Sequence, residues 1–175
     1  MVEDDDGFQM IESHLDVADG FFSTDVLTTG LENAYDPSAN TYSIIGALES
    51  SDYVQIDGNY ELKLIYKYSD GTEDVLEWSQ SSWITESSVV GADLSNIVDA
   101  EADNDNRRFR GLALSSWSST YLDGNGADKS YWWHAVASTT AWGGGILAHE
   151  GKIAYSSSLW IRPGIVLVLA LQLRP

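Results

Sequence analysis

The sequence has no cysteine and few basic residues. Its 175 residues contain 9 Lys and Arg against 27 Asp and Glu, which gives a formal net charge of −18. Without cysteine there is no disulfide framework, no thiolate metal site and no cysteine nucleophile. With so few cations, binding to nucleic acid is disfavoured, because phosphate contacts need clustered Lys and Arg. Anionic membrane surfaces are disfavoured for the same reason.

Two further absences concern membranes and export. A membrane-spanning helix needs about 20 apolar residues, whereas the longest apolar run covers only residues 165–173. The sequence therefore predicts no transmembrane segment. Its first residues are acidic, whereas a secretory signal begins with basic residues followed by an apolar stretch. No signal peptide is expected here.

What the sequence does contain is enough apolar and aromatic material for a core. Hydrophobic residues make up 43% of the chain, with 7 Trp and 9 Tyr, which excludes a disordered acidic chain. The length suits one domain. We expect a single β-rich domain over residues 1–175, with an acidic amino-terminal portion, 1–59, and an apolar carboxy-terminal strand, 164–175.

The negative charge is concentrated in the first third of the sequence. Of the 27 acidic residues, 14 precede Lys63, which is the first basic residue, and the rest of the chain carries 13 acids and 9 bases. The simplest interpretation is a solvated face that keeps the protein soluble. The alternatives are adaptation to high salt and acidic loops that take up Ca²⁺ outside the cell.

A β-hairpin is the clearest local prediction. In residues 60–68, aromatic and aliphatic side chains alternate with Glu61, Lys63 and Lys67, which indicates a strand with one apolar and one polar face. The Asp70-Gly71 dipeptide that follows is typical of a hairpin turn. The return strand is expected over residues 75–78, continuing to 81–84.

The remaining pattern is also that of a β protein. Further strands are expected at residues 41–48, 109–114, 131–137, 152–155, 158–161 and 165–173, and a short helix at 92–102. Short strands separated by Gly, Asp and Ser turns, such as the one at residues 57–59, are typical of antiparallel architectures. We predict a mainly β fold, either an antiparallel β-sandwich or a strongly twisted sheet, with few short helices.

The sequence offers little support for catalysis. The histidines are His14, His134 and His149, and none belongs to a Ser-His-Asp order, a nucleophile elbow or a His-x-x-x-His pair. No carboxylate pair is set in apolar surroundings that would raise its pKa. We predict that the protein is not an enzyme.

Two acidic loops are candidate Ca²⁺ sites. The loop at residues 123–128 places oxygen atoms of Asp123, Asn125 and Asp128 close together on a glycine-rich backbone, and Ca²⁺ prefers oxygen ligands. Residues 99–106 form the second candidate. Neither loop has EF-hand spacing. The alternative is that both are ordinary Asx-Gly turns that bind no metal.

An aromatic stretch follows the first loop and suggests a sugar-binding surface. The candidate ligand-binding residues are Tyr131, Trp133, His134 and Trp142. In a strand, the adjacent Trp132 and Trp133 would point to opposite faces, so one ring would lie in the core and the other at an interface or a ligand.

The order of these motifs resembles the fibrinogen-like domain, the globe of fibrinogen chains and of ficolin-type lectins, over residues 60–163. The matching segments are residues 60–64 with their Asp-Gly turn, Ser119-Thr120-Tyr121-Leu122-Asp123-Gly124-Asn125, Tyr131-Trp132-Trp133, Gly144-Gly145-Ile146 and Ile161-Arg162-Pro163. The paired cysteines of that family are missing. The resemblance implies sugar binding beside a Ca²⁺ loop, through Asp123, Asn125, Tyr131, Trp133 and His134.

Two functions follow from these observations. The first is a self-assembling extracellular or cell-surface subunit of a fibre, appendage or array, because the apolar run 165–173 suits insertion into a neighbour's sheet. In the alternative reading of that run, it completes the sheet of its own chain. The second function is a Ca²⁺-dependent glycan-binding module that uses Asp123, Asn125, Trp133 and Trp142. Because acidic halves repel, assembly should be favoured by Ca²⁺ or salt, or by contacts with Arg107, Arg108 and Arg110.

Overall fold

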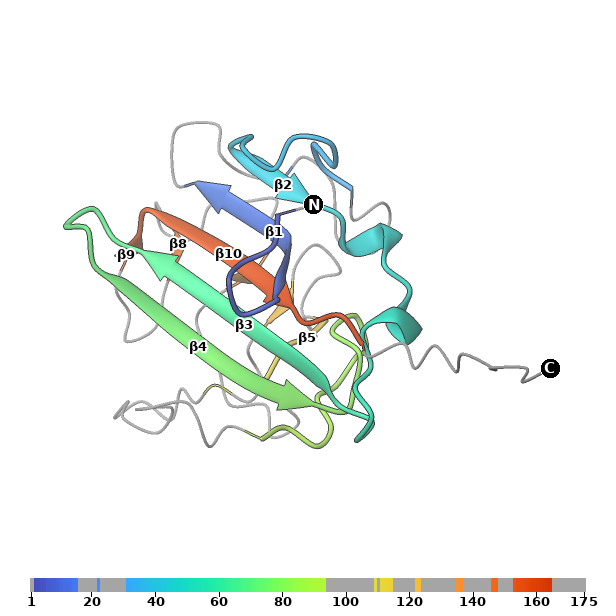
Figure 1. The fold of residues 1–175 in the computed structure, drawn as a ribbon. Helices are drawn as coiled ribbons and strands as arrows, with labels where there is room; N and C mark the ends of the chain where they lie inside the picture. Colours follow the sequence, from blue (N-terminus) through green and yellow to red (C-terminus); the bar gives the residue numbers. More distant parts are fainter. Residues whose placement is uncertain are drawn as a thin grey trace.

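The computed structural model describes residues 2–15, 22, 31–93, 109, 111–114, 122–123, 135–136, 146–147 and 153–164. Within these ranges the fold is mainly β, with antiparallel sheets and two three-residue 3₁₀ helices (Figure 1). The predicted fold class is therefore confirmed. No helix in the described residues is long and apolar enough to cross a membrane.

The largest sheet has five strands in the order β2-β1-β10-β3-β4. Their bounds are β1 Gln9–Leu15, β2 Thr41–Ser43, β3 Tyr60–Lys67, β4 Glu73–Gln80 and β10 Ser156–Ile161. All neighbouring pairs are antiparallel. Strand β10, far along the sequence, lies between β1 and β3 in the middle of the sheet (Figure 1).

The predicted hairpin is present as β3 and β4, which pair from Tyr60↔Gln80 to Lys67↔Glu73. Leu62, Leu64 and Tyr66 are completely buried on the inner face, as their alternation indicated. The extension of the return strand to residues 81–84 is wrong, because β4 ends at Gln80. Beyond it, the amides of residues 81 and 82 donate to the carbonyl of Val90.

One turn geometry occurs three times, at residues 4–8, 55–59 and 68–72. In each, the fourth residue is a glycine whose amide donates to the first carbonyl over 2.9–3.1 Å, while the first amide donates to the fifth carbonyl. The glycines Gly7, Gly58 and Gly71 have φ of 81°, 85° and 86°, a region that favours glycine. Each follows an aspartate, so the Asp-Gly dipeptide is the sequence signal.

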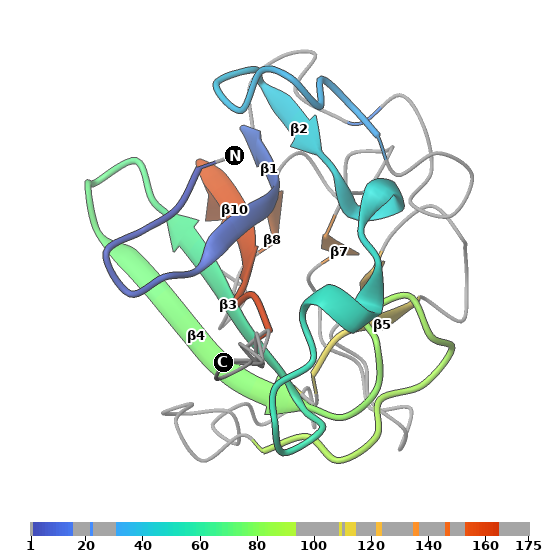
Figure 2. The same ribbon diagram turned by 45° about the vertical axis from the view of Figure 1, so that its right-hand side comes forward.

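Short strands form the rest of the fold. Strands β5 (Ala113–Leu114), β6 (Leu122–Asp123) and β7 (Ala135–Val136) make a three-stranded sheet, and β8 (Ile146–Leu147) pairs with β9 (Ile153–Ala154). Strands β5 and β7 lie across from the main sheet (Figure 2). Leu112, Leu122, Val136 and Ile146 join the same buried cluster as Leu62, Leu64, Leu159 and Ile161. The core therefore lies between the main sheet and these short strands.

Several predicted elements differ from those observed. The range 41–48 is strand only over β2 and then forms the 3₁₀ helix η1 (Ile45–Ala47); the second 3₁₀ helix, η2 (Ser50–Asp52), follows beyond it. The ranges 109–114, 131–137 and 152–155 contain β5, β7 and β9, and 158–161 lies within β10. Strands β1, β6 and β8 are not predicted by the sequence. The predicted strand 165–173 and nearly all of the predicted helix 92–102 lie outside the described residues.

Candidate functional site

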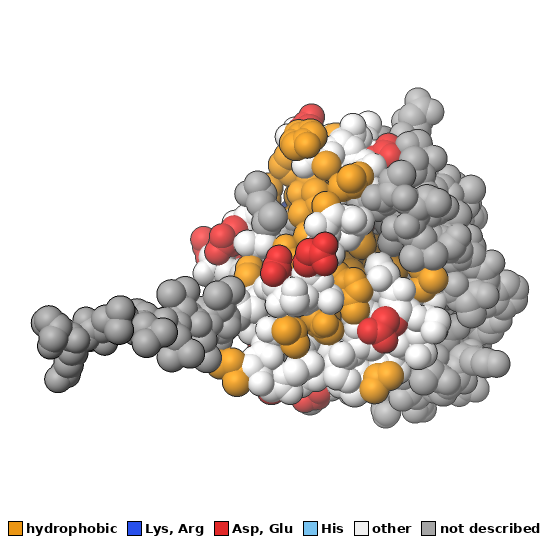
Figure 3. Space-filling view, turned by 90° about the vertical axis from the view of Figure 1, so that its right-hand side faces the viewer, with side chains coloured by type: hydrophobic (Ala, Val, Ile, Leu, Met, Phe, Trp, Pro, Cys, Tyr) orange, Lys and Arg blue, Asp and Glu red, His pale blue; other side chains and the backbone are white. Residues whose placement is uncertain are grey.

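A groove of about 490 Å³ opens between residues 31–35 and the two 3₁₀ helices. Its lining is mainly apolar, with two carboxylates at the rim. The lining residues are Leu31, Asn33, Ala34, Tyr35, Ile44, Ala47, Leu48, Glu49, Asp52 and Tyr53. On this face hydrophobic side chains form a band with acidic side chains among them, and no described Lys or Arg is visible there (Figure 3).

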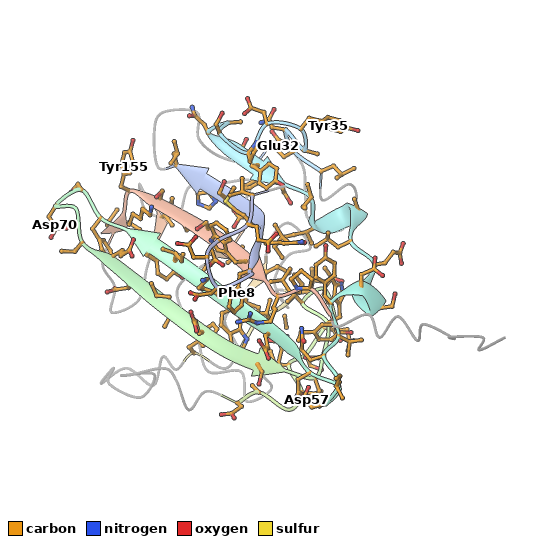
Figure 4. The ribbon with its side chains drawn as sticks, in the orientation of Figure 1. Phe8, Glu32, Tyr35, Asp57, Asp70 and Tyr155 are labelled. Carbon is orange, nitrogen blue, oxygen red and sulfur yellow. The ribbon has the colours of Figure 1, made fainter. Side chains whose placement is uncertain are left out.

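One wall of the groove is an irregular segment fastened to the edge strand β2. The backbone of Glu32 exchanges hydrogen bonds of 3.0 and 2.8 Å with Ser43. Asn33 adopts a φ of 47°, which asparagine tolerates better than most residues, and its side-chain amide donates to the Thr41 carbonyl at 2.7 Å. The turn that follows leaves the Tyr35 ring fully exposed beside Glu32 (Figure 4).

The opposite wall is anchored by aromatic packing. Tyr53 is only 6% exposed and stacks on Trp83 with ring centroids 6.1 Å apart. Trp83 in turn packs edge-on against Tyr60 of β3, at 5.0 Å. Burial raises the pKa of Tyr53, and the nearby charge of Asp52 raises it further. Its phenol therefore stays protonated at neutral pH.

The chain leaves the described region at one margin of the groove. After β10, the carbonyls of Arg162 and Pro163 accept hydrogen bonds from the Gln55 side chain, at 3.3 and 3.1 Å. The Gly164 amide donates to the Asp52 carbonyl at 2.7 Å. A Cβ at residue 164 would lie 2.6 Å from the Val54 carbonyl oxygen, so this position requires glycine.

The chemistry of the groove suits binding. The described residues that line it include no His, Ser, Thr, Lys or Arg. An apolar floor with a few polar groups at its edge is the usual composition of a binding site. The charged groups at this rim are the carboxylates of Glu49 and Asp52, which attract positive charge.

A second polar cluster is buried beneath the main sheet. His14 Nδ1 lies 3.1 Å from Glu12 Oε1, and both side chains are at most 2% exposed. Tyr66 and Ser157 face the same interior. Burial, followed by the charges of Tyr68, Glu12 and Asp74, raises the pKa of Tyr66 well above its usual value. Because these groups are buried in the core, we assign them to packing.

A third cluster corrects the predicted polar face of β3. Lys63 is 4% exposed rather than solvated, because residues 2–9 fold back over β10 and β3 (Figure 1). Its ammonium forms an ion pair with Asp4 and lies 4.4 Å from the centroid of the Phe8 ring. Arg162 lies 4.3 Å from the same ring and hydrogen-bonds Glu61 and the Asp6 carbonyl.

Most residues of the predicted Ca²⁺ and glycan sites lie outside the described part of the chain. These are Asn125, Asp128, Tyr131, Trp133, His134 and Trp142, together with the second loop at residues 99–106. The backbone of Asp123 lies in β6, paired with Ala113 and Ala135. Among the described residues, no three His, Asp or Glu side chains are grouped so as to hold a metal ion.

The tripeptide Asp-Gly-Asn of the predicted Ca²⁺ loop also occurs in the described turn at residues 55–59. There the Asp57 carboxylate accepts hydrogen bonds from the amide and the side chain of Asn59, both at 3.0 Å (Figure 4). These hydrogen bonds lower the pKa of Asp57. In this turn the hydrogen bonds to the aspartate carboxylate come from the asparagine of the same tripeptide. The interpretation of residues 123–125 as an ordinary turn that binds no metal requires the same arrangement.

The comparisons with known proteins return no relative. No protein-family model matches the chain, and no curated protein or solved structure matches it. The resemblance to the fibrinogen-like domain therefore stays a prediction from the motifs quoted above.

Proposed function

We propose that this protein is a non-enzymatic, self-assembling structural or adhesive subunit that works outside the cell or at its surface, in a fibre, appendage or array. The observation that carries the proposal is the groove face. Leu31 is 45% exposed there and the Tyr35 ring is fully exposed. Contiguous exposed apolar groups around a groove are typical of protein-interaction surfaces, and exposed tyrosines often dominate the binding energy of such surfaces.

The test is the mass of the full chain as a function of concentration, by sedimentation velocity. We expect the average mass to rise, and Tyr35→Ser to weaken association about tenfold or more. Tyr155→Ser is the matched control, since Tyr155 is also exposed but lies at the other end of the sheet (Figure 4). A full chain that stays monomeric at every concentration would rule the proposal out.

The alternative, a Ca²⁺-dependent glycan-binding module, rests on sequence motifs alone. It needs the groups at residues 123–142, and no contact of the described residues favours it. For that reason self-association is the function that we propose.

A further inference from the structure

The groove defines the chemistry of its occupant. Its floor is aliphatic and aromatic, and its rim carries Glu49 and Asp52. A continuous apolar segment would bind most favourably in a groove of this kind, because it removes the most apolar surface from water. The negative rim favours a cation at one end of that segment.

This chain contains such a segment. Residues 165–173 read Ile-Val-Leu-Val-Leu-Ala-Leu-Gln-Leu, and Arg174 follows directly. The run has no acidic residue that the rim would repel. In a chain with a net charge of −18, an apolar run that ends in an arginine is complementary to an acidic, apolar groove.

The position of Gly164 relates this segment to the groove. The Gly164 amide donates a hydrogen bond to the Asp52 carbonyl, and Asp52 also lines the groove. The segment therefore starts on the same face that holds the groove. Two copies that meet through this face around a two-fold axis present the same patch to each other, which brings the start of each segment to the face that holds the other copy's groove.

We propose that the groove binds residues 165–174 of a second copy, so that two copies exchange these segments reciprocally and form a closed dimer, which is the building unit of the proposed assembly. The inference rests on the proposed self-association and names the partner of the groove. An extended run of this length spans about 30 Å and begins at the margin of its own groove, so it reaches well beyond that groove. A second copy supplies a groove that can bury this run, and a second apolar run that packs with it.

The test uses one variant on each side of the contact. Leu31→Asp places a charge in the groove, and Leu169→Asp places a charge in the segment. Val75→Asp is the matched control for the groove variant, because Val75 is 46% exposed against 45% for Leu31 and does not line the groove. Circular dichroism melting curves show whether each variant is folded.

We expect the full chain and Val75→Asp to form dimers, and each of the other two variants alone to associate at least about tenfold more weakly. An equimolar mixture of Leu31→Asp and Leu169→Asp restores one intact contact. Native mass spectrometry with one partner isotopically labelled should then show mixed dimers. A segment that docked within its own chain would give no such rescue.

Other outcomes overturn the inference in recognisable ways. If the full chain associates and both variants associate equally well, the exchange is wrong while self-association stands. If the mixture shows no rescue, or if Val75→Asp loses dimers as well, the groove is not the acceptor. If the full chain is monomeric throughout, the inference and the proposed function fail together.

Discussion

Phe8 explains how a lysine is accommodated under the amino-terminal turn. Its ring is 3% exposed and has the Lys63 ammonium and the Arg162 guanidinium within 4.4 Å of its centroid. A cation over an aromatic face contributes about 2 kcal/mol when it is desolvated. The ring and the Asp4 carboxylate together replace the water that Lys63 loses, so the outer face of β3 and β10 tolerates a buried charge.

The first prediction concerns Asp4. Burial raises the pKa of its carboxyl, but hydrogen bonds from Lys63 and the Phe8 amide and the charge of Lys63 outweigh burial and lower it. A lowered pKa in the folded state means that Asp4 stabilises the fold fully above its unfolded pKa, about 3.9. This contribution is lost as the pH falls through the folded pKa.

Asp4→Asn should therefore lower the free energy of unfolding by about 1–2 kcal/mol at pH 7, measured by urea denaturation. The difference from the parent protein should shrink as the pH falls below about 4. Asp5→Asn is the control, because Asp5 is exposed, and it should change stability by less than about 0.5 kcal/mol. Equal effects of the two variants would contradict the role of Asp4.

At the scale of elements, the Gln80 side chain joins β4 to the segment before β5. It is completely buried. Its oxygen accepts hydrogen bonds from Trp78 Nε1 and the Leu112 amide, both at 2.9 Å, and its nitrogen donates to the carbonyls of Ser82 and Leu112. Gly111 makes room for this amide, since a Cβ there would lie 2.6 Å from its oxygen.

Gln80→Leu should destabilise the protein by at least about 2 kcal/mol, because it leaves buried hydrogen-bond donors and acceptors of Trp78 and Leu112 without a partner. Gln9→Leu is the matched control in β1, where the glutamine is only partly buried. Urea denaturation measures both. A loss no larger than that of the control would show that the Gln80 hydrogen bonds are replaced by water.

Strands whose apolar residues alternate with polar ones in the sequence were predictable, even where they bury a polar side chain, as β3 and β4 do with Lys63 and Gln80. Strands β3 and β4 alternate regularly and were located from the sequence. Strand β1 was missed because Glu12 and His14 point inward and the register shifts between Met10 and Glu12. The amino-terminal turn has the same Asp-Gly signal as the hairpin, in Asp6-Gly7, and that dipeptide would have located it.

The groove could not be predicted, because its walls are an irregular segment and 3₁₀ turns. Sequence patterns give no means of telling the exposed Leu31 and Tyr35 from core residues. Their exposure depends on the backbone of Asn33 and on pairing with β2, a contact between segments that periodicity does not encode. The apolar run at 165–173, which we propose as the occupant of the groove, is visible in the sequence.

At the scale of the whole molecule, charge should govern association. Lys63 and Arg162 form ion pairs with Asp4 and Glu61 of their own chain, so they are not available for ion pairs with a second copy. The net charge of −18 per chain then opposes assembly, and added salt screens it.

We therefore expect the dissociation constant of the dimer to fall as NaCl rises from low to physiological ionic strength, measured by sedimentation equilibrium. CaCl₂ at matched ionic strength separates screening from specific Ca²⁺ binding, which would give a larger effect. Association that weakens with salt would instead show that attraction between Arg174 and the acidic rim outweighs the net repulsion.

The central position of β10 has a consequence for folding order. Before residues 156–161 are available, β1 with β2 and β3 with β4 are two separate ribbons, and the edges of β1 and β3 that β10 later pairs are open. Pairings such as Gln9↔Ile161 close very long loops, which makes folding slow. During synthesis the sheet cannot close until β10 leaves the ribosome, so the nascent chain exposes two unpaired edges that are open to aggregation.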